Sequence, residues 1–240
     1  MTLDVIQDLR PVLGPVRDQG RRPTCLSFAA SAAHEKARGE VDPLCVEWLF
    51  YHAAQRAGTG PGEGTTLPDT RQVLQDIGQP LEASWPYDGR PINGAAWRPP
   101  TSVSPIFRCG SDGCGTNLAQ VRQALEGGKP VVLAIFVSAA FTAAATWLRT
   151  GNEIILPDDS EPIDPQRGHA VVAVGYGRIG SEDLILVRNS WGPAWGADGH
   201  AWVRETYVSR RLFGGFSISE GDGDVLQSDA GGIHAHARVG

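Results

Sequence analysis

The chain has 240 residues, of which 41% are hydrophobic and 20% are charged, so it can fold as a globular protein with a substantial core. The formal net charge of −6 argues against a nucleic-acid partner, because neutralising phosphates requires a basic surface. No run of apolar residues is long enough to span a membrane, so we expect no membrane partner either.

The N-terminal stretch "MTLDVIQDLRPVL" lacks the basic start and apolar core of a secretory signal. We therefore expect a cytoplasmic protein, with export by a signal-independent route left open. Its four cysteines, which should be reduced there, are Cys25, Cys45, Cys109 and Cys114. A bridge between Cys109 and Cys114 is sterically possible but not implied. The strong excess of arginine over lysine is typical of a GC-rich, bacterial genome.

Three helices are predicted in the first half. The first begins at Cys25, with Thr24 as its N-cap, and ends at Gly39. The second covers "VDPLCVEWLFYHAAQRAG", with Pro43 near its first turn and Gly58 at its end. The third covers "LPDTRQVLQDIG", where proline near the start and glycine after the end favour these bounds. The glycine-rich stretch "GTGPGEGTT" between the last two lacks the features of a phosphate loop and predicts a flexible turn or a backbone ledge.

The second half changes character after a fourth helix in "TNLAQVRQALEGG". Short apolar runs separated by glycine and proline predict strands of an antiparallel sheet or barrel, buried on both faces. These runs are "PVVLAIF", "HAVVAVGYG", "DLILVRNSW" and "HAWV". The last residues are small, polar and rich in glycine, which is typical of a flexible tail.

Four residues could together support nucleophilic catalysis by a cysteine. Cys25 opens a helix, where unpaired N–H groups and the helix dipole favour a thiolate. His169 enters a strand, Asn189 leaves another, and Gln19 lies in the loop ahead of the cysteine. Taken singly, each also fits an ordinary role: a buried thiol, a satisfied histidine, an asparagine in a turn and a solvated glutamine.

The combination resembles the papain-like cysteine peptidases. The resemblance rests on "PVRDQGRRPTCLSFAASAAHE", on "GHAVVAVGYG" and on "LILVRNSWGPAWGADGHAWV", and it extends from about Pro15 to Ile218. His169 and Asn189 lie 144 and 164 residues beyond Cys25, compared with about 130–150 in the family. We expect the implied insertion in "RTGNEIILPDDSEPIDPQ".

The resemblance implies an α+β fold with two lobes and the active site in the cleft between them. Residues 1–115 would form a mainly helical lobe carrying Cys25, residues 116–218 a β-rich lobe carrying His169 and Asn189, and residues 219–240 a flexible tail. It also implies a peptide or protein as substrate and no cofactor. An inhibitory or delivery protein is a further possible partner.

Roles for single residues follow from the same resemblance. Cys25 would be the nucleophile, His169 its acid and base, and Asn189 the group that orients His169. The Gln19 side chain and the Cys25 N–H would bind the oxyanion, and Trp191 would shield the Asn189–His169 contact from water. Substrate would lie along a glycine-rich ledge and between the neighbours of the histidine. The residues expected there are Gly64, Thr65, Thr66, Gly168 and Ala170.

The sequence departs from the family at three points. Leu26 follows the nucleophile where tryptophan is usual, and Arg22 replaces a cysteine that in secreted members is bridged to the glycine-rich loop. If Met1 is the native start, the lead ahead of Cys25 is too short for an inhibitory propeptide; in a trimmed chain that segment would simply be missing.

The resemblance implies an endopeptidase that hydrolyses peptide bonds through a thioester on Cys25. Other interpretations remain open. The same thioester could serve a transferase, a deamidase or an isopeptidase, and an idle site would make the chain a peptide-binding relative. The spacing in "CGSDGC" and the "HAH" near the C-terminus do not match a common zinc pattern, so we expect no metal site.

Overall fold

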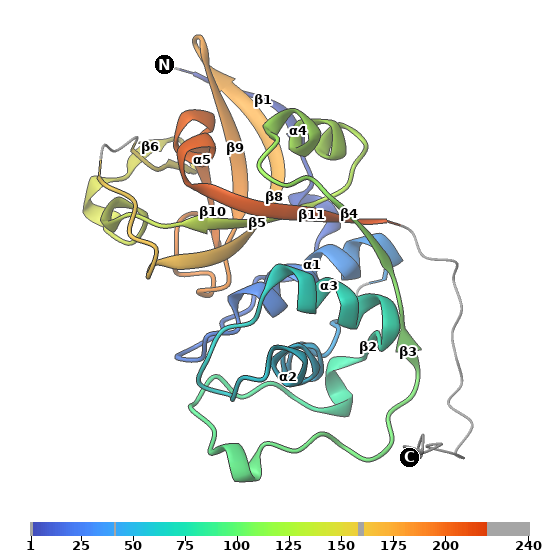
Figure 1. The fold of residues 1–240 in the computed structure, drawn as a ribbon. Helices are drawn as coiled ribbons and strands as arrows, with labels where there is room; N and C mark the ends of the chain where they lie inside the picture. The colour runs from blue at the N-terminus through green and yellow to red at the C-terminus, as the bar shows by residue number, and fades with distance from the viewer. Residues whose placement is uncertain (1, 41, 158–160, 220–240) are drawn as a thin grey trace, which may run out of the picture.

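The computed structural model describes residues 2–40, 42–157 and 161–219. In Figure 1 a large sheet forms the upper part of the molecule, α2 and α3 lie in the lower part, and α1 runs between the two. The α+β class with a helical and a β-rich part is therefore confirmed. The predicted flexible tail lies, beyond Ser219, outside the described residues.

Helix α1 (Cys25–Arg38) has the bounds predicted from the sequence. Gly39 follows it in the left-handed conformation, at φ 69°, and its N–H bonds to the Lys36 carbonyl. Thr24 occupies the N-cap position, but its side chain makes no capping hydrogen bond. The first N–H groups of the helix are therefore not used by a cap.

The other predicted helices form with small shifts. Helix α2 (Val46–Ala57) begins later than expected because the Cys45 thiol caps it, accepting from the Trp48 N–H at 3.3 Å. Pro43 therefore lies ahead of the helix and not in its first turn. Helix α3 (Leu67–Asp76) is capped by Thr66, and α4 (Leu118–Glu126) by Asn117. The sequence analysis did not predict α5 (Glu205–Arg211).

The sheet contains the four predicted strands and others that were not predicted. Among the described residues its strands run in the order β4-β11-β5-β8-β9-β10-β7-β6, with β1 on β8 as well, and β7 and β10 pair in parallel. A separate short pair is formed by β2 (Gln79–Pro80) and β3 (Ile106–Phe107). The bounds are β1 Leu3–Asp8, β4 Gly110–Gly113, β5 Val131–Phe136, β6 Leu148–Thr150, β7 Glu153–Ile155, β8 Gly168–Ile179, β9 Glu182–Arg188, β10 His200–Arg204 and β11 Leu212–Ser219.

Two strands from the first 115 residues belong to the sheet. Strand β1 pairs with β8, and β4 pairs with β11. A boundary at residue 115 therefore does not separate the helices from the sheet, because residues 1–115 contribute a strand to the sheet near each of their ends. The prediction missed these strands because each is short and pairs with a strand far away in the sequence.

The Gly-Tyr-Gly segment of β8 allows β1 to pair closely with it. A Cβ atom on Gly175 would lie 2.3 Å from the Gln7 carbonyl oxygen, and one on Gly177 would lie 2.5 Å from that of Asp4. Only glycine permits such a close approach of two backbones. Between the two glycines, Tyr176 is buried in the core.

No described helix combines the length and the apolar character that crossing a membrane would require.

A buried histidine should make stability depend on pH. His34 of α1 is 1% exposed and bonds through Nδ1 to the Gln79 Oε1 at 3.0 Å, while the Gln79 amide nitrogen donates to Ser31 and Cys45. Burial lowers the pKa of His34 to about 4. The stabilisation is therefore complete above the ordinary histidine pKa of about 6.5 and is lost as the pH falls towards about 4, by roughly 3 kcal/mol. Urea unfolding across this range should show a shallower decline in His34→Asn than in the parent; parallel curves would contradict the assignment.

Candidate active site

Three elements bring the predicted catalytic residues together. Cys25 is the first residue of α1, His169 lies near the start of β8, and Asn189 directly follows β9. His169 is 7% exposed and Asn189 is 3% exposed, whereas Cys25 is half-buried and accessible from the adjoining hollow. The predicted nucleophile therefore comes from the helical part and its predicted partners from the sheet.

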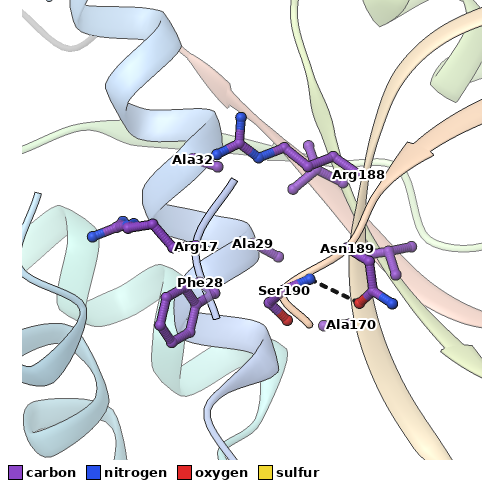
Figure 2. Close-up of a pocket in the computed structure, with 10 residues that line it drawn as sticks. Arg17, Phe28, Ala29, Ala32, Ala170, Arg188, Asn189 and Ser190 are labelled. Carbon is purple, nitrogen blue, oxygen red and sulfur yellow. Dashed lines mark hydrogen bonds between the residues drawn. The ribbon is translucent and has the colours of Figure 1, made fainter. Parts of the chain in front are cut away.

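The Asn189 side chain holds the His169 ring. Its Oδ1 lies 2.8 Å from His169 Nε2 and accepts a second hydrogen bond, also of 2.8 Å, from the Ser190 N–H (Figure 2). Because an amide oxygen can only accept, Nε2 carries the hydrogen, and Nδ1 remains for the contact with Cys25. The Asn189 backbone is fixed in turn by its N–H bond to the Gly199 carbonyl, at 2.9 Å.

The Cys25 thiol differs electrostatically from the other three. Burial raises the pKa of Cys25, but the hydrogen bond and charge of His169, together with the N–H groups of Ala170 and Leu26, bring it below its ordinary value. For the other thiols burial prevails. It raises the pKa of Cys45 and of Cys109 to about 12, and it also raises the pKa of Cys114. Cys25 is thus the one of the four that the surroundings turn towards a thiolate.

Aromatic rings cover the His169–Asn189 contact. The Trp191 ring lies 4.6 Å from the His169 ring between centroids, tilted by 31°. Phe141 and Trp195 pack against Trp191 at 5.8 and 6.0 Å. Trp191 therefore packs on the His169 ring, and Phe141 and Trp195 enclose Trp191 in turn; its role as a shield stays a prediction.

The seam between α1 and the Asn189 segment is closely packed. Figure 2 shows Ala29 and Ala32 of α1 facing the stretch from Arg188 to Ser190. The hollow that remains there measures only about 20 Å³, about the space of one water. Small side chains on this face of α1 therefore let the helix that carries Cys25 approach the strand ends that carry its partners.

A larger hollow of about 510 Å³ opens beside Cys25 and His169. The five predicted substrate residues, Gly64, Thr65, Thr66, Gly168 and Ala170, all line it. Further walls, which the sequence analysis missed, are Pro23, Leu26, Leu67, Pro68, Ala134 and Phe213. The predicted set of substrate residues was therefore incomplete. Phe213 comes from β11, and nothing in its local sequence marks it as part of a site.

Gln19 lies next to the segment that carries Asn189. Its N–H bonds to the Ser190 carbonyl at 2.8 Å, and its side chain is 7% exposed. The solvated side chain considered for an isolated glutamine is therefore wrong. The bridge between Asp18 and Trp191 continues this contact.

Of the features considered as an alternative metal site, only the two cysteines lie within the described residues. Cys109 and Cys114 are free, buried thiols. The two histidines of "HAH" lie outside the described residues. Across residues 2–40, 42–157 and 161–219, no three ligand side chains of His, Cys, Asp or Glu are grouped to hold a metal ion.

Comparison with known proteins gives a consistent result. The family model described as papain family cysteine protease matches residues 102–210, a range that includes His169, Asn189 and Trp191. Cathepsin J of Rattus norvegicus is 29% identical over 199 residues, which cover 77% of this chain and 55% of the relative. Oryzain gamma chain of Oryza sativa subsp. japonica is 26% identical over 196 residues, covering 79% and 51%. The chain thus spans about half the length of these curated relatives.

Solved structures share the fold. Xylellain, a cysteine protease from Xylella fastidiosa, superposes with a TM-score of 0.71 at 22% identity, covering 90% of this chain and 86% of that one. The cysteine protease CMS1MS2 of Carica candamarcensis, in complex with E-64, gives 0.65 at 23% identity, covering 89% and 97%.

Proposed function

We propose that this chain, which belongs to the papain family of cysteine proteases, is an endopeptidase that cleaves peptide bonds through a thioester on Cys25. The observation that carries the proposal is the lowered pKa of Cys25 beside His169, whose Nε2 lies 2.8 Å from the Asn189 Oδ1. A thiolate with an oriented imidazole beside it is the arrangement that acyl transfer to sulfur requires.

The reaction would proceed in two stages. The Cys25 thiolate attacks the peptide carbonyl carbon, and the oxygen gains negative charge. The Cys25 N–H, which has no partner within the helix, and the Gln19 amide would donate to that oxygen. His169 protonates the leaving amine, and the thioester remains. His169 then takes a proton from water, which attacks the thioester and releases the acid.

The hollow beside Cys25 favours an extended peptide with an apolar side chain. Residues 64–66 offer a backbone edge for pairing, as extended substrates commonly use. The walls next to this edge are apolar except for Cys25 and His169, and none of the described Asp, Glu, Lys or Arg residues lines the hollow. An apolar substrate side chain would be buried there, whereas a charged one would lose its hydration without a partner.

A digest of a peptide library should reveal both the activity and this preference. We expect the parent to cleave peptides that carry an apolar residue close to the cut bond, and the Phe213→Ala variant to lose about tenfold in kcat/KM on them, because one wall is removed. Mass spectrometry of the products locates the cut and the preference.

Two controls separate this function from its alternatives. Cys25→Ala should be inactive, whereas Cys114→Ala, which removes a buried thiol elsewhere, should remain active. Adding a free amine distinguishes a transferase, because a ligated product would then exceed the free acid. Binding of library peptides without any cleavage would favour the non-catalytic relative and contradict the proposal. A bacterial source and a cytoplasmic location remain predictions from the sequence.

A further inference from the structure

The orientation of the Gln19 side chain depends on two neighbours. Its amide nitrogen donates to the Arg22 carbonyl oxygen at 2.8 Å, and its amide oxygen accepts from the Ser190 hydroxyl at 2.7 Å. One amide hydrogen is thus committed to Arg22, and only the second is free to act on a substrate oxygen. The direction of that second N–H is set by the position of the Arg22 carbonyl.

The Arg22 side chain is one of the largest fully buried groups of the described chain. Only 2% of Arg22 and 1% of Glu47, on α2, is exposed. The two guanidinium NH₂ groups bond to the two carboxylate oxygens of Glu47, and one of them also donates to the Asp88 carbonyl at 3.0 Å. The Trp97 indole N–H donates to Glu47 at 2.5 Å. This bidentate geometry fixes the side chain, and with it the backbone of Arg22, firmly in place.

The segment around Tyr87 holds the rest of the same loop. The Tyr87 hydroxyl donates to the Gln19 carbonyl at 2.8 Å and lies 2.7 Å from the Thr24 hydroxyl. The Arg22 guanidinium carbon lies 5.1 Å from the centre of the Tyr87 ring. Gly20, at φ 61°, packs so closely on Gly89 that a Cβ would lie 2.6 Å from its carbonyl oxygen. The loop from Gln19 to Thr24 is thus fixed by backbone contacts with the segment around Tyr87. The buried Arg22 side chain also anchors it to the core of the helical part.

We propose that Arg22 and Glu47 are positioning residues for the oxyanion donor Gln19. The inference rests on the proposed function, whose chemical steps use neither residue. A buried ion pair is often no more stabilising than apolar side chains of the same volume, so stability alone does not account for it. Its geometric effect is to hold the carbonyl that orients the Gln19 amide. Weakening the pair should therefore slow the steps in which the oxyanion forms and leave substrate binding unchanged.

A double-mutant cycle tests this coupling. We expect Glu47→Gln to lower kcat by about tenfold with little change in KM, a fraction of the loss that follows removal of a whole oxyanion donor. In the Gln19→Ala background the same change should have less than about a twofold effect, because no donor remains to be positioned. Independent, additive losses in the two backgrounds would overturn the inference.

Glu153→Gln is the matched control. Glu153 also binds an arginine, Arg10, through both carboxylate oxygens and accepts from an indole N–H, that of Trp202. It lies on β7, between β10 and β6 in the sheet. This variant should shift the unfolding temperature but leave kcat unchanged; a loss of kcat equal to that of Glu47→Gln would show a general effect of weakened packing and overturn the inference.

A second variant covers the case in which Glu47→Gln does not fold. Arg22→Met combined with Glu47→Leu replaces the pair by apolar groups of similar size, which buried ion pairs commonly tolerate. It should fold, retain the Cys25 alkylation rate and show the same loss of kcat; parent-like kcat would refute the positioning role. A parent that hydrolyses no peptide would instead count against the proposed function, so the two failures are distinguishable.

Discussion

Alkylation of Cys25 by iodoacetamide is expected to remain fast down to about pH 5 in the parent protein, as for other cysteines paired with histidine. The reason is the lowered pKa of Cys25, for which the charge and hydrogen bond of His169 outweigh burial. Below an ordinary thiol pKa of about 8.5 the rate falls about tenfold per pH unit. In His169→Ala this ordinary profile, further slowed by burial, should return. The difference at about pH 5 should reach roughly a thousandfold.

Peptide mass spectrometry after labelling assigns the reaction to one thiol. Cys45, Cys109 and Cys114 are buried and their pKa values are raised, so they act as internal controls that should stay unlabelled. A plain thiol profile for Cys25 in the parent would mean that the site is idle, and the peptide-binding interpretation would then be preferred.

Gln19→Ala should reduce kcat by about 10²–10³-fold, the usual cost of losing one oxyanion donor. The fold should survive, because the Ser190 hydroxyl and the Arg22 carbonyl would each lose only one hydrogen bond, worth about 1 kcal/mol apiece. Steady-state kinetics with a peptide substrate measures the loss, and urea unfolding measures the stability.

Gln72→Ala is the comparison variant for this change. Gln72 lies on α3 and bonds to Asp76 on the exposed face of that helix. Its removal should leave the kinetics unchanged. An essentially unchanged rate in Gln19→Ala itself would refute the role assigned to Gln19.

The sequence brought forward the candidate site residues more completely than the strands of the sheet. Motif order and spacing singled out Cys25, His169, Asn189 and Gln19 as candidates, and the structure places them on neighbouring segments; their catalytic roles stay predictions. Strands such as β1 and β11 were missed because they are defined by partners: β1 pairs with residues near Gly177, far along the chain. Local patterns of alternation contain no information about such partners.

Residues whose role depends on contacts between distant segments of the chain are missed for the same reason. Phe213 lines the hollow because β11 pairs with β5, and the sequence does not indicate that pairing. The sequence analysis singled out Arg22 only because it replaces a cysteine of the family. Nothing in the local sequence of α2 indicates that Glu47 pairs with it. From sequence alone, a charged residue in an amphipathic helix is expected to face solvent, and only the packing shows that it is buried.

Strand β1 also has a consequence for how the protein is made. It leaves the ribosome before Cys25 and long before β8 (Gly168–Ile179), the strand with which it pairs. His169 follows Cys25 by 144 residues, which corresponds to roughly 7–30 s of bacterial or eukaryotic translation. During that time the thiol has no imidazole beside it, and the hollow lacks the wall that β11 supplies. The contact between Cys25 and His169 and the wall from β11 therefore form only after most of the described residues have been synthesised.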